Sequence, residues 1–267
     1  MCTVSFLAGL GVCRHMPRLA DKTALVTGAG RGIGRGIAEG LAEEGAHVAV
    51  NHLPTDEDAA EAAEVVDAVD AAGGDAFALP GDVSDEDSVE AMLDSFVDEV
   101  GEVPDVLVNN AGVVRQSRLE EMPVEQWDEV MSVDLRGVFL VTRYTVPGML
   151  ERGSGKIVNI ASQLGIKGGT ELVHYSAAKA GVIGMTRALA REISPEVNVN
   201  AIAPGPVETT LLDDLSEEWR AAKEAELPMG RLGRVEDIVP TAVFLASDES
   251  DDYTGQTLSP DGGDAMH

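Results

Sequence analysis

Short apolar runs alternate with longer amphipathic segments along most of the chain. The runs with the length and composition of buried strands are 23–27, 47–51, 76–79, 106–109, 156–160, 197–203 and 256–258. Strands that are apolar on both faces and joined by helical crossovers form a parallel sheet, because each crossover returns on the same hand. We therefore predict an α/β fold: one domain with a doubly wound parallel sheet of about seven strands.

Two connections between the strands have distinct patterns. Residues 56–72 predict a helix with its acidic side chains outward, ended by Gly73 and Gly74, because glycine is common at helix C-termini. Residues 204–233 form an irregular stretch, too long for a typical connection. Insertions of this kind often cover a binding site, so we interpret this one as a lid.

The 267 residues suffice for one large domain with a complete core. We expect residues 18–267 to form it and residues 1–17 to be a disordered extension. Two alternatives stay open for this extension: a start placed too early, with Met16 as the true beginning, or a secreted protein. Residues 3–12 are apolar but lack a basic start, and no stretch of the sequence approaches the ~18 apolar residues of a membrane span. The two cysteines, Cys2 and Cys13, exclude a disulfide scaffold.

Acidic residues dominate the charge. Asp and Glu number 47 against 19 Lys and Arg, which gives a net charge of -28, and only five basic residues are lysines. Such a surface repels nucleic acid and anionic membranes, so we expect neither as a partner. We interpret the acidity as adaptation to molar salt, where the Debye length shrinks to ~3 Å. The expected location is the cytoplasm of a high-salt cell, and an ordinary, moderately acidic cytosolic protein is the alternative.

A glycine-rich turn, Thr27-Gly-Ala-Gly-Arg-Gly-Ile-Gly34, follows the first predicted strand. In doubly wound sheets, ligands bind beyond the carboxyl ends of the strands, and glycines let the backbone approach a pyrophosphate at a helix N-terminus. The spacing Thr-Gly-x-x-x-Gly-x-Gly differs from the common Gly-x-Gly-x-x-Gly pattern. The turn nevertheless predicts a dinucleotide site.

Tyr175 and Lys179 stand four residues apart, and Tyr175 follows Ser162 by 13 residues. Four residues place both side chains on one helix face, about 6 Å apart along the axis. A free tyrosine ionises near pH ~10, and a neighbouring ammonium lowers this pKa because it favours the phenolate. Ser162 supplies a hydroxyl for a substrate oxygen. These three residues predict proton transfer at that oxygen.

Together with Asn109-Asn110-Ala111-Gly112 after the fourth strand, these motifs resemble the classical short-chain dehydrogenase/reductase family over about residues 20–263. Asp82, the segment Pro204–Thr209 and Asp261-Gly262-Gly263 match further family motifs. The resemblance implies a Rossmann-like fold, reversible hydride transfer between nicotinamide C4 and a carbonyl carbon, and a homotetramer. It is greatest to the 3-oxoacyl-carrier-protein reductases and related sugar and alcohol dehydrogenases.

The resemblance also implies roles for individual residues. Tyr175 is the general acid or base, Lys179 tunes it and binds ribose hydroxyls, and Ser162 polarises the substrate oxygen. The fourth catalytic position, an asparagine in the family, is Asp134, whose carboxylate would partly cancel the effect of Lys179 on Tyr175. No metal is expected. The cofactor contacts expected are Thr27, Gly28, Gly30, Arg31, Gly32, Ile33, Gly34, Asn51, Asp82, Val83, Asn109, Ala111, Gly112, Tyr175, Lys179, Pro204, Gly205, Val207 and Thr209.

The choice of dinucleotide depends on the end of the second strand. NAD specificity usually needs a carboxylate there to bind the ribose hydroxyls, and this strand ends Val50-Asn51-His52-Leu53. Arg31 resembles a basic residue that meets a 2′-phosphate. We favour NADP, with NAD as the alternative.

Substrate contacts are expected from Gln163, His174 and Leu211. Leu211, Leu212, Leu215 and Trp219 have helical spacing, which is also typical of core or of a subunit interface. No basic patch for an acidic carrier protein is evident, so we rank a small sugar-, polyol- or hydroxy-acid-like substrate above a 3-oxoacyl thioester of acyl-carrier protein or CoA. A dinucleotide sensor without activity is a further alternative, because fold does not fix function.

The acidic composition generates a prediction about salt. The fold should loosen at low ionic strength, since like charges then repel over a longer distance. The melting temperature is therefore expected to be lower in dilute buffer than in molar KCl. Equal melting temperatures in the two solutions would contradict the interpretation as salt adaptation.

Overall fold

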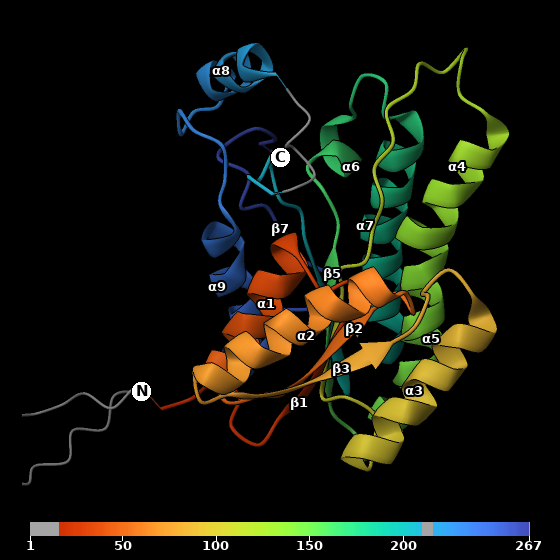
Figure 1. Ribbon diagram of the computed structural model, residues 1–267, viewed down its shortest axis with the longest axis vertical. Coiled ribbons are helices and arrows are strands. Elements are labelled where there is room, and N and C mark those ends of the chain that lie inside the picture. Colours follow the sequence, from red (N-terminus) through yellow and green to blue (C-terminus); the bar gives the residue numbers. More distant parts are fainter. Residues whose placement is uncertain (1–15, 210–215, 267) are drawn as a thin grey trace, which may run out of the picture.

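The computed structural model describes residues 16–209 and 216–266 (Figure 1). Most of the expected N-terminal extension, including Cys2 and Cys13, therefore lies outside the described residues. The same holds for Leu211, Leu212 and Leu215, so the expected substrate contact at Leu211 stays a prediction.

The described part of the chain forms one seven-stranded parallel sheet in the order β3-β2-β1-β4-β5-β6-β7. This confirms the predicted fold class, and each predicted strand agrees with the structure to within one residue at either end. The strands are β1 (Thr23–Val26), β2 (His47–His52), β3 (Asp75–Pro80), β4 (Val106–Asn109), β5 (Gly155–Ile160), β6 (Val197–Ile202) and β7 (Thr257–Leu258).

Helices cover both faces of the sheet, as expected for a doubly wound fold (Figure 1). The alternation along β1 shows the two layers: Ala24 and Val26 join one core cluster, and Leu25 between them joins the other. The helices are α1 (Gly32–Glu43), α2 (Asp56–Ala71), α3 (Glu86–Val100), α4 (Val124–Met131), α5 (Val138–Arg152), α6 (Leu164–Lys167), α7 (Val173–Ile193), α8 (Glu217–Glu226) and α9 (Val235–Ala246), with a π-helical turn η1 (Ser132–Gly137) between α4 and α5. The first cluster packs α1, α2 and α9 on the sheet, and the second packs α3, α5 and α7.

Local signals in the sequence explain several helix ends. Thr55 caps α2 by accepting a hydrogen bond from Asp58 N, and Gly73 follows the helix with a φ of +85°. This confirms the predicted helix. The stretch 204–233, which we interpreted as irregular, contains the ten-residue α8. Ser216 caps α8 by accepting from Trp219 N at 3.2 Å, and two acidic residues occupy its first turn.

Close packing of α9 against α1 depends on two glycines. A Cβ atom at Gly36 would collide with the Val235 side chain, and one at Gly40 would collide with the Val239 side chain. Because α1 starts at the glycine turn, this contact fixes the helix that leads away from the expected cofactor site.

Replacing Gly40 by alanine is expected to lower the free energy of unfolding by ~1–3 kcal/mol, because overpacking outweighs the gain in helix propensity. Gly184 is a matched control: it also lies within a helix, and its added Cβ would meet nothing within 4 Å. Gly184→Ala should raise the free energy of unfolding by ~0.5–1 kcal/mol. Denaturant titrations in molar KCl measure both, and equal effects of the two substitutions would contradict the packing argument.

Candidate active site

The glycine turn is tied to the end of β4 by Thr27. Its hydroxyl oxygen accepts hydrogen bonds from the backbone N–H groups of Asn110 (2.9 Å) and Ala111 (3.0 Å). Asn110 Nδ2 donates in return to the carbonyls of Thr27 and Gly28 at 2.9 and 3.0 Å. The two segments that would flank a dinucleotide therefore form one hydrogen-bonded unit at the carboxyl ends of β1 and β4.

Two glycines of this turn are required by its shape. Gly28 has a φ of +60°, and a Cβ there would lie 2.9 Å from the Cα of Ala111. Gly32, with a φ of +58°, begins α1, and its Cβ would face the side chain of Thr209 at 3.5 Å. The turn thus brings the expected cofactor residues of the glycine turn, the β4 end and the Pro204–Thr209 segment together. Gly30, Ile33 and Gly34 lie in the same turn and the start of α1.

Asn51 and Asn109 are buried and hydrogen-bonded within the protein. Asn51 Oδ1 accepts from Gly28 N at 3.1 Å, and its Nδ2 donates to Leu79 O at 3.2 Å and Gly81 O at 3.1 Å. Asn109 Nδ2 donates to Asn159 Oδ1 at 2.8 Å. The structure therefore gives both side chains a supporting role, since each holds a neighbouring segment. Direct contact of either side chain with a cofactor stays a prediction.

The remaining expected cofactor residues lie around this turn. The Arg31 side chain is 58% exposed and pairs with Glu61 at 3.0 Å and Asp58 at 3.9 Å, both on α2. Asp82 follows β3, where its Oδ1 accepts from Ser84 N and Ser84 Oγ at 2.9 and 2.7 Å. Val83, Gly112, Pro204, Gly205 and Val207 follow the carboxyl ends of β3, β4 and β6.

Ser162, Tyr175 and Lys179 come together at the carboxyl end of β5. Ser162 follows β5, and the other two lie near the start of α7. Lys179 Nζ lies 5.6 Å from the centroid of the Tyr175 ring and donates to Ile160 O at 3.0 Å. Ser162 lies close enough to the Tyr175 phenol to lower its pKa, and its Oγ accepts from Leu164 N at 3.1 Å. The structure therefore assembles the hydroxyl, phenol and ammonium groups that the sequence spacing suggested.

Asp134 completes this group from the π-helical turn η1. Its side chain is fully buried, with Oδ2 3.1 Å from Lys179 Nζ and Oδ1 accepting from Val113 N at 2.8 Å. A Cβ atom at Gly112 would lie 2.9 Å from Asp134 Oδ2, so a larger residue there would displace the carboxylate. Lys179 is thus held between a carboxylate and a carbonyl.

Burial and charge act against each other in this group. Burial raises the pKa of Tyr175, the Lys179 ammonium lowers it, and the Asp134 carboxylate raises it; the net direction is upward. The effect of Lys179 on the pKa of Tyr175 is downward, as we expected, but burial is the larger effect and sets the net direction. Burial also raises the pKa of Asp134, against the opposing effects of Lys179 and the Val113 N–H. Burial lowers the pKa of Lys179, but Asp134 and Tyr175 outweigh it and the net direction is upward.

The two expected substrate residues within the described chain are buried. Gln163 donates its backbone N–H to Pro204 O at 3.0 Å, which connects the Ser162 segment to the segment after β6. His174 has its Nε2 3.2 Å from Gln126 Nε2, and burial lowers its pKa despite the nearby charges of Asp134 and Glu129. Gln163 directly follows Ser162 and His174 directly precedes Tyr175, and their contact with substrate stays a prediction. Their burial was not visible in the sequence.

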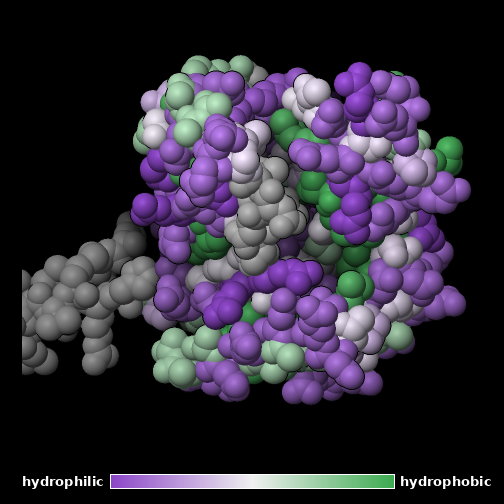
Figure 2. Space-filling view, turned by 45° about the horizontal axis from the view of Figure 1, so that its top comes forward, coloured by the Kyte–Doolittle hydropathy of each residue, from purple (hydrophilic) through white to green (hydrophobic). Residues whose placement is uncertain are grey.

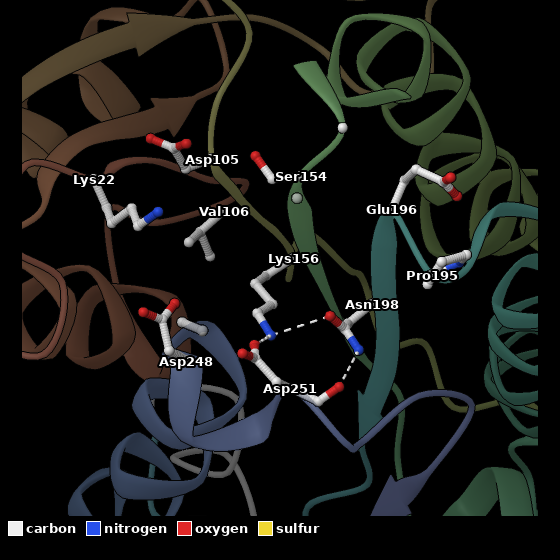
Figure 3. Close-up of a pocket in the computed structure, with 13 residues that line it drawn as sticks. Lys22, Asp105, Val106, Ser154, Lys156, Pro195, Glu196, Asn198, Asp248 and Asp251 are labelled. Carbon is white, nitrogen blue, oxygen red and sulfur yellow. Dashed lines mark hydrogen bonds and ion pairs between the residues drawn. The ribbon is translucent and has the colours of Figure 1, made fainter. Parts of the chain in front are cut away.

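A cavity of about 420 Å³ lies at the opposite, amino-terminal edge of the sheet (Figure 3). Its lining includes Lys22, Asp105, Lys156 and Asp251, all distant from Tyr175 in the topology. Lys156 Nζ contacts Asp251 Oδ1 at 2.6 Å and Asn198 Oδ1 at 3.1 Å, so this ammonium is engaged in structural contacts. The cavity lacks the phenol and glycine turn of the candidate site.

The described residues contain no helix that is both long and apolar enough to cross a membrane. They also contain no group of three or more His, Cys, Asp or Glu side chains placed to hold a metal ion. The surface seen in Figure 2 is mainly hydrophilic, in agreement with the acidic composition.

Known proteins resemble the chain over most of its length. Residues 28–264 match the family model described as enoyl-(acyl carrier protein) reductase. The 3-oxoacyl-[acyl-carrier-protein] reductase FabG of Staphylococcus aureus is 44% identical over 243 residues, which cover 91% of this chain and 97% of the relative. The FabG of Thermotoga maritima is 39% identical over 254 residues, covering 92% and 98%.

Two solved structures agree closely with the fold. A candidate NAD(P)-dependent gluconate 5-dehydrogenase from Beutenbergia cavernae, with bound NADP at low occupancy, is 42% identical, with a TM-score of 0.86 and coverage of 93% and 98%. A candidate 2-deoxy-D-gluconate 3-dehydrogenase from Agrobacterium tumefaciens, with bound NADP, is 40% identical, with a TM-score of 0.85 and coverage of 94% and 98%. The parallel sheet, the group of Ser162, Tyr175 and Lys179 and these similarities lead to one conclusion: the chain belongs to the short-chain dehydrogenase/reductase family and is an NAD(P)-dependent oxidoreductase.

Proposed function

We propose that the protein transfers a hydride between a nicotinamide dinucleotide and a ketone or secondary alcohol of a small polar molecule, such as a sugar, polyol or hydroxy acid. The observation that carries this proposal is the placement of Lys179 Nζ 5.6 Å from the centroid of the Tyr175 ring, with Ser162 beside the same phenol. A hydroxyl and a phenol placed together can hold one substrate oxygen and exchange a proton with it.

The residues of the glycine turn fit a dinucleotide. Gly28 leaves the backbone open where a side chain would collide with Ala111, and α1 begins within the turn, at Gly32. The backbone N–H groups at this helix N-terminus favour a pyrophosphate. When bound, the nicotinamide supplies or accepts the hydride. The protein's own residues then orient the reactants and move the proton.

Tyr175 would donate its proton to the substrate oxygen in reduction and accept one in oxidation. Ser162 would hold that oxygen in place by a hydrogen bond. Lys179 would favour the phenolate and meet the ribose hydroxyls, while Asp134 opposes the first of these effects. The proton affinity of the phenol therefore depends on the balance between one ammonium and one carboxylate.

For the cofactor we favour NADP, with NAD as the alternative. Asn51, near the end of β2, is hydrogen-bonded to Gly28 and to Leu79 of β3. The strand ends Val50-Asn51-His52 and so has no acidic residue to bind the ribose hydroxyls. Arg31 is exposed beside the turn, although a 2′-phosphate would have to share it with Glu61 and Asp58. The bound NADP of two similar structures supports the same choice.

For the substrate, the solved relatives named as gluconate dehydrogenases support a small polar molecule. The relatives named FabG support the alternative, a 3-oxoacyl thioester of acyl-carrier protein or CoA. The charge of -28 disfavours an acidic carrier partner, since like charges repel across an interface. The family membership and the intact Tyr175 and Lys179 pair disfavour the sensor hypothesis.

The proposal extends to the setting of the enzyme. We infer a homo-oligomer, a tetramer by resemblance, in the cytoplasm of a high-salt cell. The half-exposed apolar side chains of Phe139 and Leu150 on α5 support a protein contact, and the net charge of -28 supports the salt environment.

Tyr175→Phe tests the proposed reaction, because it removes the proton donor and keeps the ring. In molar KCl, NADPH and NADH are titrated by fluorescence, and turnover is followed by absorbance with sugars, polyols, hydroxy acids and 3-oxoacyl thioesters. The parent should turn over a small polar substrate, and the variant should lose ~10²–10⁴-fold in kcat with unchanged NADPH binding. Turnover of thioesters alone would favour the alternative substrate, and turnover that survives in the variant would remove Tyr175 from the reaction.

Asp134→Asn tests the balance of charge at Lys179. Without the carboxylate, the ammonium acts unopposed and the pKa of Tyr175 falls. In pH–rate profiles, the rise in the rate of alcohol oxidation and the fall in the rate of carbonyl reduction should both move to lower pH. Activity should stay within about 10-fold of the parent, because Tyr175 and Lys179 remain.

Asp105→Asn is the control for this substitution. Asp105 is also a shielded acid, but it binds Thr23 N at 2.9 Å at the opposite edge of the sheet. Its pH–rate profile should match that of the parent. An unshifted profile in Asp134→Asn would show that this carboxylate does not act on the phenol.

A further inference from the structure

One carboxylate near the C-terminal end joins two helices at the edge of the sheet that carries the active site. Asp264 Oδ1 lies 2.6 Å from Lys167 Nζ, at the end of α6, and 2.8 Å from Lys223 Nζ, on α8. Figure 1 shows α6 and α8 at the same end of the molecule. Two ammonium groups are therefore held together by a single oxygen.

This ion cluster is well shielded from solvent. The side chains of Asp264, Lys223 and Lys167 are 8%, 14% and 34% exposed. Charged hydrogen bonds of this kind are stronger than neutral ones, and salt screens shielded pairs less than exposed ones. Removing one partner leaves a shielded charge unpaired, which raises the free energy of the folded state.

The use of lysines makes the cluster unusual within this chain. The sequence has five lysines against 47 acidic residues, so a lysine on the surface has many carboxylates available to it. Two of the five nevertheless meet at one shielded carboxylate. Glu226, the other acidic partner of Lys223, lies at 3.4 Å and is 69% exposed. The pairing with Asp264 thus links α6 to α8 and does more than neutralise a surface charge.

The turn that carries Asp264 is itself firmly placed. Asp261 Oδ1 accepts from Gly263 N and its Oδ2 accepts from Ala265 N, both at 2.8 Å. A Cβ atom at Gly205 would lie 2.7 Å from the backbone oxygen of Asp261, so the turn rests on the segment after β6. Met229 N donates to Gly262 O at 3.2 Å, which attaches the chain just beyond α8 to the same turn.

The two helices joined by Asp264 belong to the segments where substrate choice is expected. The helix α6 starts two residues after Ser162, and α8 lies in the stretch 204–233 that we interpreted as a lid. We expect the position of α6 relative to α8 to shape the space available to the substrate. A link between them therefore bears on substrate binding and leaves the proton-transfer groups untouched.

We propose that Asp264 is a positioning residue that fixes the substrate-binding wall by holding Lys167 of α6 and Lys223 of α8 on one carboxylate. The effect on substrate binding rests on the proposed function, whereas the link between the helices does not. Burial raises the pKa of Asp264, but hydrogen bonds from Lys167 and Lys223 outweigh it, and the net direction is downward. The carboxylate is therefore ionised at neutral pH, as the link requires.

Two measurements on Asp264→Asn test the proposal. Loss of the carboxylate leaves two neighbouring ammonium groups that repel, so backbone amides of α8 should exchange hydrogen about 10-fold faster, with those of α3 unchanged. The KM for the substrate found in the panel should rise about 10-fold, and kcat and NADPH affinity should stay within about threefold, since one charged hydrogen bond corresponds to roughly a factor of ten.

Lysine variants provide the controls. Lys223→Met should reproduce the faster exchange of α8 and the higher KM, and Lys223→Arg should restore both, because it keeps the charge. Lys156→Met is the matched control: Lys156 also pairs with an aspartate at 2.6 Å and is 12% exposed, but it lies at the opposite edge of the sheet. It should change neither the exchange of α8 nor the KM.

The outcomes distinguish a failure of the Asp264 link from a failure of the proposed enzymatic activity. Unchanged exchange of α8 in both Asp264→Asn and Lys223→Met would overturn the link, whatever the activity. Faster exchange with an unchanged KM would overturn the positioning role. If the parent turns over no substrate of the panel, the proposed function fails, and the exchange of α8 still decides whether Asp264 holds the two helices.

Discussion

The buried ammonium of Lys179 is the interaction on which the rest of the site depends. It donates to Ile160 O at the end of β5 and lies 3.1 Å from Asp134 Oδ2 on η1, while its own backbone belongs to α7. A buried charge is tolerated only when it is paired and hydrogen-bonded, so these three elements must keep their relative positions. The need for glycine at position 112 follows from the same contact, since a side chain there would displace the carboxylate.

Much of the fold was predictable because its signals are local. Apolar runs of strand length and helical segments between them indicated the parallel sheet, and turn or cap residues such as Gly73 marked the ends of elements. The candidate site was predictable for a related reason: Tyr175 and Lys179 lie four residues apart on one helix, and their spacing fixes their geometry before any tertiary contact forms.

The features that were missed all depend on contacts between distant segments. The register of β1 with β2 turns the Asn51 amide toward Gly28, and that of β4 with β5 places Asn109 beside Asn159. The net direction of the Tyr175 pKa shift depends on burial, which no spacing reveals. The cluster at Asp264 joins residues separated by 97 and 41 positions, so no pattern along the chain marked it.

The π-helical turn between α4 and α5 has a consequence for how Asp134 is aimed. Each additional residue in a helix rotates the following side chains by about 100°, and a π turn takes up one such residue without breaking the helix. The direction of the Asp134 carboxylate is thus set by the number of residues in Ser132–Gly137 as well as by their identity. Length is therefore under constraint in this segment: a single deletion would keep Asp134 and Lys179 in the sequence and still turn the carboxylate away from the ammonium.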